Sequence, residues 1–127
     1  MRSTRGKVGT VALLTLSTMF LSALPAMART SDSIEDGWDT AYASNSYSWE
    51  YGHEATAKVC DNEPDGNSVR AEVYTYDGTR YDLVDNFGGD CAWVFPKGTG
   101  KQIRSFRIRE DGGGWSPLAV LDRATLR

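Results

Sequence analysis

The chain has 127 residues, of which 24 % are charged and 40 % hydrophobic, and its net charge is −3 at pH 7. This length suits a single domain. An acidic chain is repelled by phosphate backbones and anionic lipid, which argues against nucleic acid and membrane surfaces as partners.

Residues 1–28 have the three parts of a secretory signal peptide. Three basic residues lie within the first seven, an uncharged and mostly apolar stretch follows at residues 8–24, and Ala26-Met27-Ala28 offers small residues to a signal peptidase. The apolar stretch falls short of the roughly 20 residues that a membrane span needs. Cleavage after Ala28 leaves 11 Lys and Arg against 17 Asp and Glu, a net charge of −6. We therefore predict a secreted, extracellular protein, with an uncleaved membrane anchor as the alternative.

Both cysteines lie in the exported part of the chain. Cys60 and Cys91 are expected to pair in an oxidising compartment. Residues 29–36 are polar and without periodicity, which predicts a flexible leader. A single β-rich domain is then expected over residues 37–127.

Short alternating runs, separated by Gly, Pro and Asp, indicate strands. Asp77-Gly78 stands between alternating runs at residues 69–76 and 79–85, which predicts a hairpin with a two-residue type I′ turn. Further strands are expected at residues 47–51, 55–60, 91–95, 102–109 and 115–121. Six or seven short strands at this spacing predict an all-β fold, a small antiparallel β-sandwich or barrel.

The disulfide is expected to join two strands across the core, with Trp93 packed beside it. This placement carries a conflict, because strict alternation puts Lys58 inward whenever Cys60 points inward. A bulge near Val59, or a bridge at the margin of the sheet, would resolve the conflict.

The predicted hairpin assigns its side chains to two faces. A two-residue turn pairs Tyr74 with Tyr81 and Tyr76 with Thr79, so three tyrosines share one face and small aliphatic residues the other. If the aliphatic side chains face the core, Tyr74, Tyr76 and Tyr81 form an exposed cluster suited to stacking sugars or gripping a protein. Trp49 is a weaker candidate for the same ligand-binding set, since its run could be core. The alternative is that the tyrosines fill the core.

Residues 61–72 partly match the calcium loop of an EF-hand, which places oxygen ligands at positions 1, 3, 5 and 12 and glycine at position 6. Those positions hold Asp61, Glu63, Asp65, Glu72 and Gly66. Glu63 and Pro64 depart from the pattern, and strands rather than helices are expected on both sides. We therefore predict a polar connection built around a Pro-Asp-Gly turn, with no metal and no cofactor.

Other polar residues give weaker signals. Five basic residues follow one another without an acidic residue between them: Lys97, Lys101, Arg104, Arg107 and Arg109. This basic run suits a solvated strand face better than a site for an anionic partner. His53 is the only histidine, which excludes a histidine-based metal cage, and no G-x-S-x-G elbow is present. We therefore predict no catalytic residues and no enzymatic activity.

Several short features together resemble small secreted single-disulfide proteins of actinobacteria of the Streptomyces type. These features are Val59-Cys60-Asp61, Asp65-Gly66, Cys91 and residues 106–111. The resemblance spans about residues 50–111 and implies a secreted bacterial β-domain without assigning functional residues. In compactness and compartment the chain is also similar to the secreted amylase inhibitors of streptomycetes. Those proteins carry two disulfides and a Trp-Arg-Tyr tripeptide, whereas this chain has two cysteines and Trp49-Glu50-Tyr51.

These observations favour a non-enzymatic extracellular binding module, a monomer whose ligand is a protein or a polysaccharide. An inhibitor of a secreted hydrolase is the alternative, and a small enzyme is a third possibility.

Overall fold

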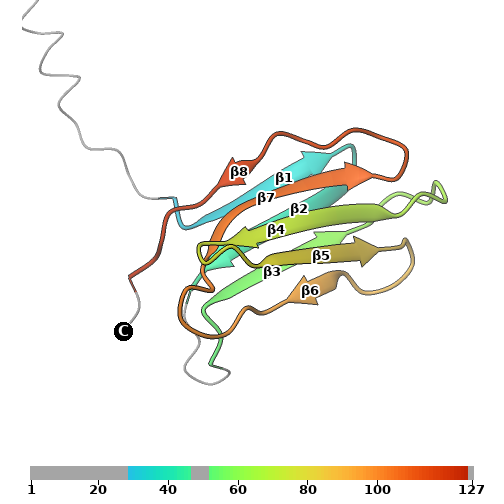
Figure 1. Cartoon of the computed structure of the whole chain (residues 1–127). Helices are drawn as coiled ribbons and strands as arrows, with labels where there is room; N and C mark the ends of the chain where they lie inside the picture. The colour runs from blue at the N-terminus through green and yellow to red at the C-terminus, as the bar shows by residue number, and fades with distance from the viewer. Residues whose placement is uncertain (1–28, 47–51, 126–127) are drawn as a thin grey trace, which may run out of the picture.

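The computed structural model describes residues 29–46 and 52–125, and within these ranges the chain forms two four-stranded antiparallel sheets and no helix (Figure 1). Sheet I has the strand order β1 (Ser31–Asp36), β2 (Asp39–Asn45), β3 (Ala55–Cys60) and β6 (Ala92–Val94). Sheet II has the order β5 (Arg80–Asp85), β4 (Val69–Thr75), β7 (Ile103–Glu110) and β8 (Ala119–Val120). The described residues include no helix that could cross a membrane.

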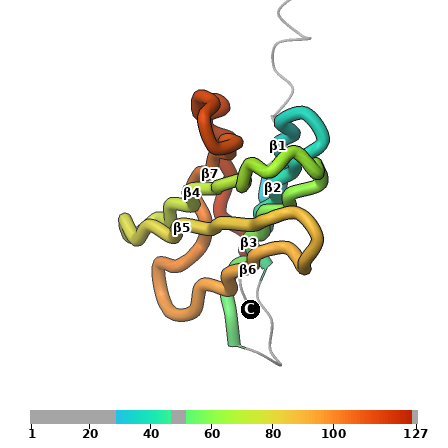
Figure 2. Tube along the Cα trace, turned by 90° about the vertical axis from the view of Figure 1, so that its right-hand side faces the viewer, coloured from blue at the N-terminus to red at the C-terminus, as the bar shows by residue number. Residues whose placement is uncertain are grey.

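Figure 2 views the molecule from the side and shows the two sheets as separate layers. The predicted all-β sandwich with one disulfide is confirmed, with eight strands in the described residues. The predicted signal peptide and the predicted strand at residues 47–51, which includes Trp49, lie outside the described residues.

The core is built from small side chains on sheet I and larger ones on sheet II. Every second residue of β2 and of β4 is buried, as expected for strands with one face on a core. Alanines dominate the inward positions of β2 and β3, whereas β7 contributes Ile103, Phe106 and Ile108, each at most 1 % exposed. Because β2 and β7 face one another across the core, small and large side chains fill the space between the sheets together.

The predicted flexible leader at residues 29–36 is wrong, because β1 occupies residues 31–36 and pairs with β2 along its whole length. Ile34 packs against the core, and the backbones of Arg29 and Asp122 are hydrogen-bonded to each other. Most of what holds β1 is backbone pairing and a single apolar side chain. Because this segment is polar and shows no clear alternation, its sequence does not predict the strand. β2 was missed for a related reason, since its inward side chains are only Asp, Ala and Asn.

The predicted β4–β5 hairpin exists, but its register differs by one residue from the prediction. Val73, not Tyr74, pairs with Tyr81, and Tyr74 pairs with Arg80. A type I′ turn needs positive φ at both central residues, whereas only Gly78 has it here, at 89°. The loop therefore spans three residues, and the Thr75 amide donates a 2.9 Å hydrogen bond to the Thr79 carbonyl. This single extra residue turns Tyr81 toward the core.

The disulfide joins Cys60 at the end of β3 to Cys91 just before β6, so it links neighbouring strands of one sheet. The predicted bridge across the core is therefore wrong, and Trp93, which is 48 % exposed, does not pack in the core. Ala92 and Val94 face the core from β6, which directs Trp93 outward. Lys58 also points outward, and the bridge lies at the sheet margin, one of the two solutions that the alternation allowed.

Candidate binding face

The outer face of sheet I carries a row of paired residues that crosses all four strands. Ser33 pairs with Tyr42, Tyr42 pairs with Lys58, and Lys58 pairs with Trp93. The residues that flank this row along β2, β3 and β6 face the core, so the row itself points away from it. The regular register of four strands therefore places one tyrosine, one lysine and one tryptophan on a continuous surface.

Aromatic rings lie toward the β6 edge of this surface. The rings of Trp93 and Phe95 lie 5.8 Å apart between centroids with planes only 7° from parallel, and each residue is about half exposed, at 48 % and 47 %. The imidazole of His53 lies 5.2 Å from the Phe95 ring. Nζ of Lys58 lies 5.0 Å from the centroid of Trp93 and 5.8 Å from that of Tyr42, within the range of a cation–π interaction. We call Tyr42, Lys58, Trp93 and Phe95 the aromatic face.

Hydroxyl groups border the aromatic face over β1, β2 and β3. On β1, β2 and β3, the outward positions described by the structure hold no aliphatic side chain and are mostly Ser and Thr: Ser31, Ser33, Thr40, Ser44 and Thr56, with Glu35 as the acidic exception. Aromatic rings bordered by short hydroxyls offer stacking and hydrogen bonding on one surface.

The outer face of sheet II is different, because its charged groups satisfy one another. Arg107 donates a 2.7 Å hydrogen bond to Glu72, and Arg80 forms ion pairs with Glu72 and Asp82. Burial alone would raise the pKa of the Glu72 carboxyl, but hydrogen bonds from Arg107 and Tyr74 outweigh it and hold that pKa below its ordinary value. A face whose charges are already paired has less to offer a ligand.

The basic run predicted as a solvated strand face is distributed over separate contacts. Lys101 pairs with Asp77 at 2.7 Å, and the guanidinium groups of Arg107 and Arg109 lie 4.6 and 4.8 Å from the ring centre of Trp115. The run therefore does not form a single patch for an anionic partner.

The structure does not bring the three predicted tyrosines together. Tyr74 lies on the outer face of sheet II, where its hydroxyl donates to Glu72 at 2.9 Å. Tyr76 lies in the hairpin loop, its hydroxyl donating to the Leu121 carbonyl at 2.7 Å, with Arg123 4.3 Å from its ring centre. Tyr81 packs against the core. Trp49, the fourth predicted ligand-binding residue, lies outside the described residues.

The segment that resembles an EF-hand loop does not have that geometry. Strands β3 and β4 flank it, and Glu72 is bound to Arg107 on the outer face of sheet II. Asp61 accepts a hydrogen bond from the amide of Glu63, and Asp65 accepts one from the amide of Asn67, as in polar turns. The segment is a polar connection between the two strands that bends at Asp65-Gly66, where Gly66 has a φ of 78°.

No family model, no curated protein and no solved structure matches the chain. Any functional conclusion therefore depends on the geometry of the described residues.

The alternation along residues 91–95 indicates which side chains share a face, but not which face is buried. The sequence predicts Trp93 beside a disulfide in the core, whereas Ala92 and Val94 are the residues of β6 that pack against the core. The conflict between Lys58 and Cys60 was the available clue. With Lys58 placed outward, its partner on the next strand must also point outward.

Proposed function

We propose that this protein is a secreted, non-enzymatic binding module that binds a polysaccharide through the aromatic face of sheet I. The observation that carries the proposal is the nearly parallel, half-exposed pair of rings at Trp93 and Phe95. Two large rings left exposed side by side present an apolar patch to water, and such patches often mark binding sites.

The composition of this face favours a sugar over a protein as ligand. The fully buried centre of a protein interface is mostly apolar, whereas the outward residues of β1, β2 and β3 are mostly hydroxyls, with one lysine and one glutamate. A sugar ring presents C–H groups on its faces, which pack against aromatic rings, and hydroxyls at its rim. Ser33, Thr56 and Lys58 are suited to hydrogen-bond such hydroxyls.

The test is retention of the oxidised, secreted protein on a panel of insoluble polysaccharides, including cellulose, chitin, xylan and peptidoglycan. We expect retention on at least one of them, and a loss of about tenfold or more in affinity for the Trp93→Ala and Phe95→Ala variants, as for aromatic residues that dominate an interface. The matched control is Trp115→Ala, which removes an aromatic residue from the opposite face.

Thermal unfolding must accompany the binding data, since both substituted residues are about half exposed and should cost little stability. Retention on no polysaccharide would contradict the proposal, as would retention that survives both substitutions. Stoichiometric capture of a secreted protein, or inhibition of a hydrolase, would instead support the inhibitor hypothesis.

A further inference from the structure

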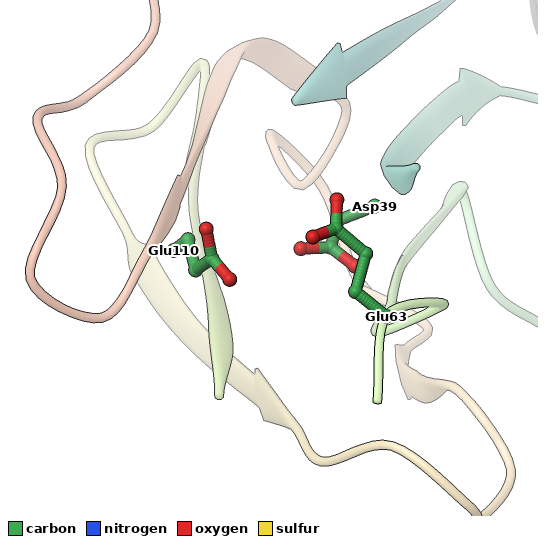
Figure 3. Close-up of side chains that lie close together, drawn as sticks. All are labelled: Asp39, Glu63 and Glu110. Carbon is green, nitrogen blue, oxygen red and sulfur yellow. The ribbon is translucent and has the colours of Figure 1, made fainter. Parts of the chain in front are cut away.

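Three carboxylates from separate segments meet at one end of the sandwich (Figure 3). Asp39 begins β2 in sheet I, Glu63 lies in the loop after β3, and Glu110 ends β7 in sheet II. Each contributes an oxygen, and these oxygens all lie within 4.8 Å of one another. Figure 3 shows the carboxylates of Asp39 and Glu63 close together and that of Glu110 turned toward them.

Asp39 is a wholly buried acid whose charge lacks compensation. Its side chain is 0 % exposed, and Oδ1 accepts a 2.8 Å hydrogen bond from the amide of Asn62. Among the residues that the structure describes, the buried Oδ2 of Asp39 has no hydrogen-bond partner, and neither has the buried Oε1 of Glu110. Unpartnered carboxylate oxygens in a protein interior are costly, and a cation placed between them would remove that cost.

Basic side chains do not supply this cation. Within residues 29–46 and 52–125, no Lys or Arg forms an ion pair with Asp39, Glu63 or Glu110, although six ion pairs occur elsewhere in these ranges. The nearby charges are instead further acids. Burial raises the pKa of Asp39 despite the hydrogen bond from Asn62, and the charges of Asp61 and Glu63 add to that effect.

Glu110 shows the same excess of negative charge. A hydrogen bond shared with Asp65, together with burial and the charges of Asp65, Glu63 and Asp39, raises its pKa to about 7. Independently of these pKa values, three carboxylates whose oxygens lie within 4.8 Å of one another repel each other when ionised, and a divalent cation between them would remove that repulsion.

We propose that Asp39, Glu63 and Glu110 bind one calcium ion, with Asp65 beside Glu110 as a further acidic ligand. Calcium takes six to eight oxygen ligands in flexible geometry, and carboxylates are its usual protein ligands. Zinc is disfavoured because these residues offer neither nitrogen nor sulfur, and magnesium is disfavoured because it demands a tight octahedron. Extracellular calcium modules bind with Kd values of about 10⁻⁴ to 10⁻³ M, so a modest site suits an exported protein.

A calcium ion at this place would join the two sheets. Asp39 and Glu110 occupy inward positions at the ends of β2 and β7, the two strands that face each other across the core. Glu63 adds the β3–β4 loop, and its Oε1 already accepts a 2.7 Å hydrogen bond from the amide of Trp38. This inference is independent of the aromatic face, since it involves different residues and a different ligand.

The test measures binding to the oxidised protein after treatment with chelator, by calorimetry with calcium chloride and by thermal unfolding. We expect one calcium per chain. At a calcium concentration about tenfold above Kd, we expect the Tm to rise by about 5–10 °C. Magnesium at the same concentration should shift the Tm less. Terbium offers an independent readout, because excitation of the neighbouring Trp38 should sensitise its emission, and calcium should quench this emission by competition.

Asp39→Asn should abolish the calcium-dependent rise in Tm and the terbium emission, while the chelated variant remains folded because a buried uncompensated charge has been removed. Glu63→Gln, in the loop, is a second variant should Asp39→Asn fail to fold. Asp82→Asn removes an acid from the outer face of sheet II and should leave calcium binding unchanged. The proposal is overturned if the wild-type protein shows neither calcium heat nor terbium emission, or if binding persists in Asp39→Asn and Glu63→Gln.

Discussion

The side chain of Asn45 forms two hydrogen bonds with the backbone of Ile103, so a single amide pairs with both polar groups of a residue in the opposite sheet. The Ile103 amide donates to Oδ1 of Asn45 at 2.6 Å, and Nδ2 of Asn45 donates to the Ile103 carbonyl at 2.7 Å. Asn45 ends β2 in sheet I and is 2 % exposed, whereas Ile103 begins β7 in sheet II. The two layers are therefore joined by polar contacts as well as by the apolar core.

Asn45→Ala should destabilise the protein by about 2–4 kcal/mol, because it leaves the amide and carbonyl of Ile103 buried without partners. The measurement is the free energy of unfolding from urea titration of the oxidised protein. Ser44→Ala, a substitution at the neighbouring outward position, is the control and should change the free energy of unfolding by less than about 0.5 kcal/mol. Equal effects of the two substitutions would show that the hydrogen bonds between Asn45 and Ile103 do not contribute to the free energy of unfolding.

Gly37→Ala should cost more stability than Gly66→Ala. Both glycines have positive φ, 63° and 78°, so both substitutions incur backbone strain of about 1 kcal/mol. A Cβ at Gly37 would also collide with Oε1 of Glu63, whereas nothing lies within 4 Å of a Cβ at Gly66. Glu63 must then swing away and lose its hydrogen bond from the Trp38 amide, which adds about 1 kcal/mol.

The difference between these two variants in urea unfolding isolates the displacement of Glu63. A difference near zero would mean that Glu63 moves without cost, and that its position is not fixed by the Trp38 amide.

The sequence allowed the fold class to be predicted because strand alternation and Asp-Gly turns are local signals. Alternation groups Val69, Ala71 and Val73 on one face of β4, and the structure shows that this face is the buried one. The register of β5 is not fixed in this way, because an Asp-Gly pair suits both a two-residue type I′ turn and a three-residue loop that ends with Gly78 at positive φ.

The candidate sites were harder to predict because they depend on contacts between distant strands. Tyr42, Lys58 and Trp93 form a row only once β2, β3 and β6 are paired in register. Asp39 and Glu110 are separated by most of the domain, and no spacing rule relates them. Alternation identifies which residues share a face within one strand, but not which strand lies alongside or opposite.

Loss of the Cys60–Cys91 disulfide should lower the free energy of unfolding by about 3–4 kcal/mol, since the bridge closes a loop between residues 31 apart in sequence. The double variant Cys60→Ala/Cys91→Ala, compared with the oxidised protein in urea, measures this. β6 is an edge strand of three residues that pairs only with β3, so it should loosen first. Fluorescence of Trp93 should therefore report an earlier transition than circular dichroism. An unchanged urea midpoint would show that backbone pairing alone holds β6.

The ion pair between Asp77 and Lys101 should make stability depend on pH on the acid side. The ammonium group of Lys101, aided by hydrogen bonds from Thr75 and Thr79, holds the pKa of Asp77 well below its ordinary value. The unfolded chain therefore takes up a proton at Asp77 before the folded chain does as the pH falls. The ion pair therefore stabilises the folded protein fully above about pH 4, the pKa of Asp77 in the unfolded chain. This stabilisation is lost progressively at lower pH.

Asp77→Asn keeps the shape of the side chain and removes its charge, so the Tm of this variant should be lower than that of the wild type at pH 7. The difference in Tm should narrow steadily as the pH falls below about 4, because the unfolded wild-type chain then takes up a proton at Asp77 while the folded chain still holds the charge. Glu72 and Asp65, whose pKa values are also lowered, titrate in both proteins and cancel in the comparison. On the alkaline side, Asp77 raises the pKa of Lys101. The difference in Tm between the wild type and Asp77→Asn should therefore persist up to about pH 10 and disappear above it. A gap that is constant across this range would assign the effect of the substitution to the shape of the turn and not to the ion pair.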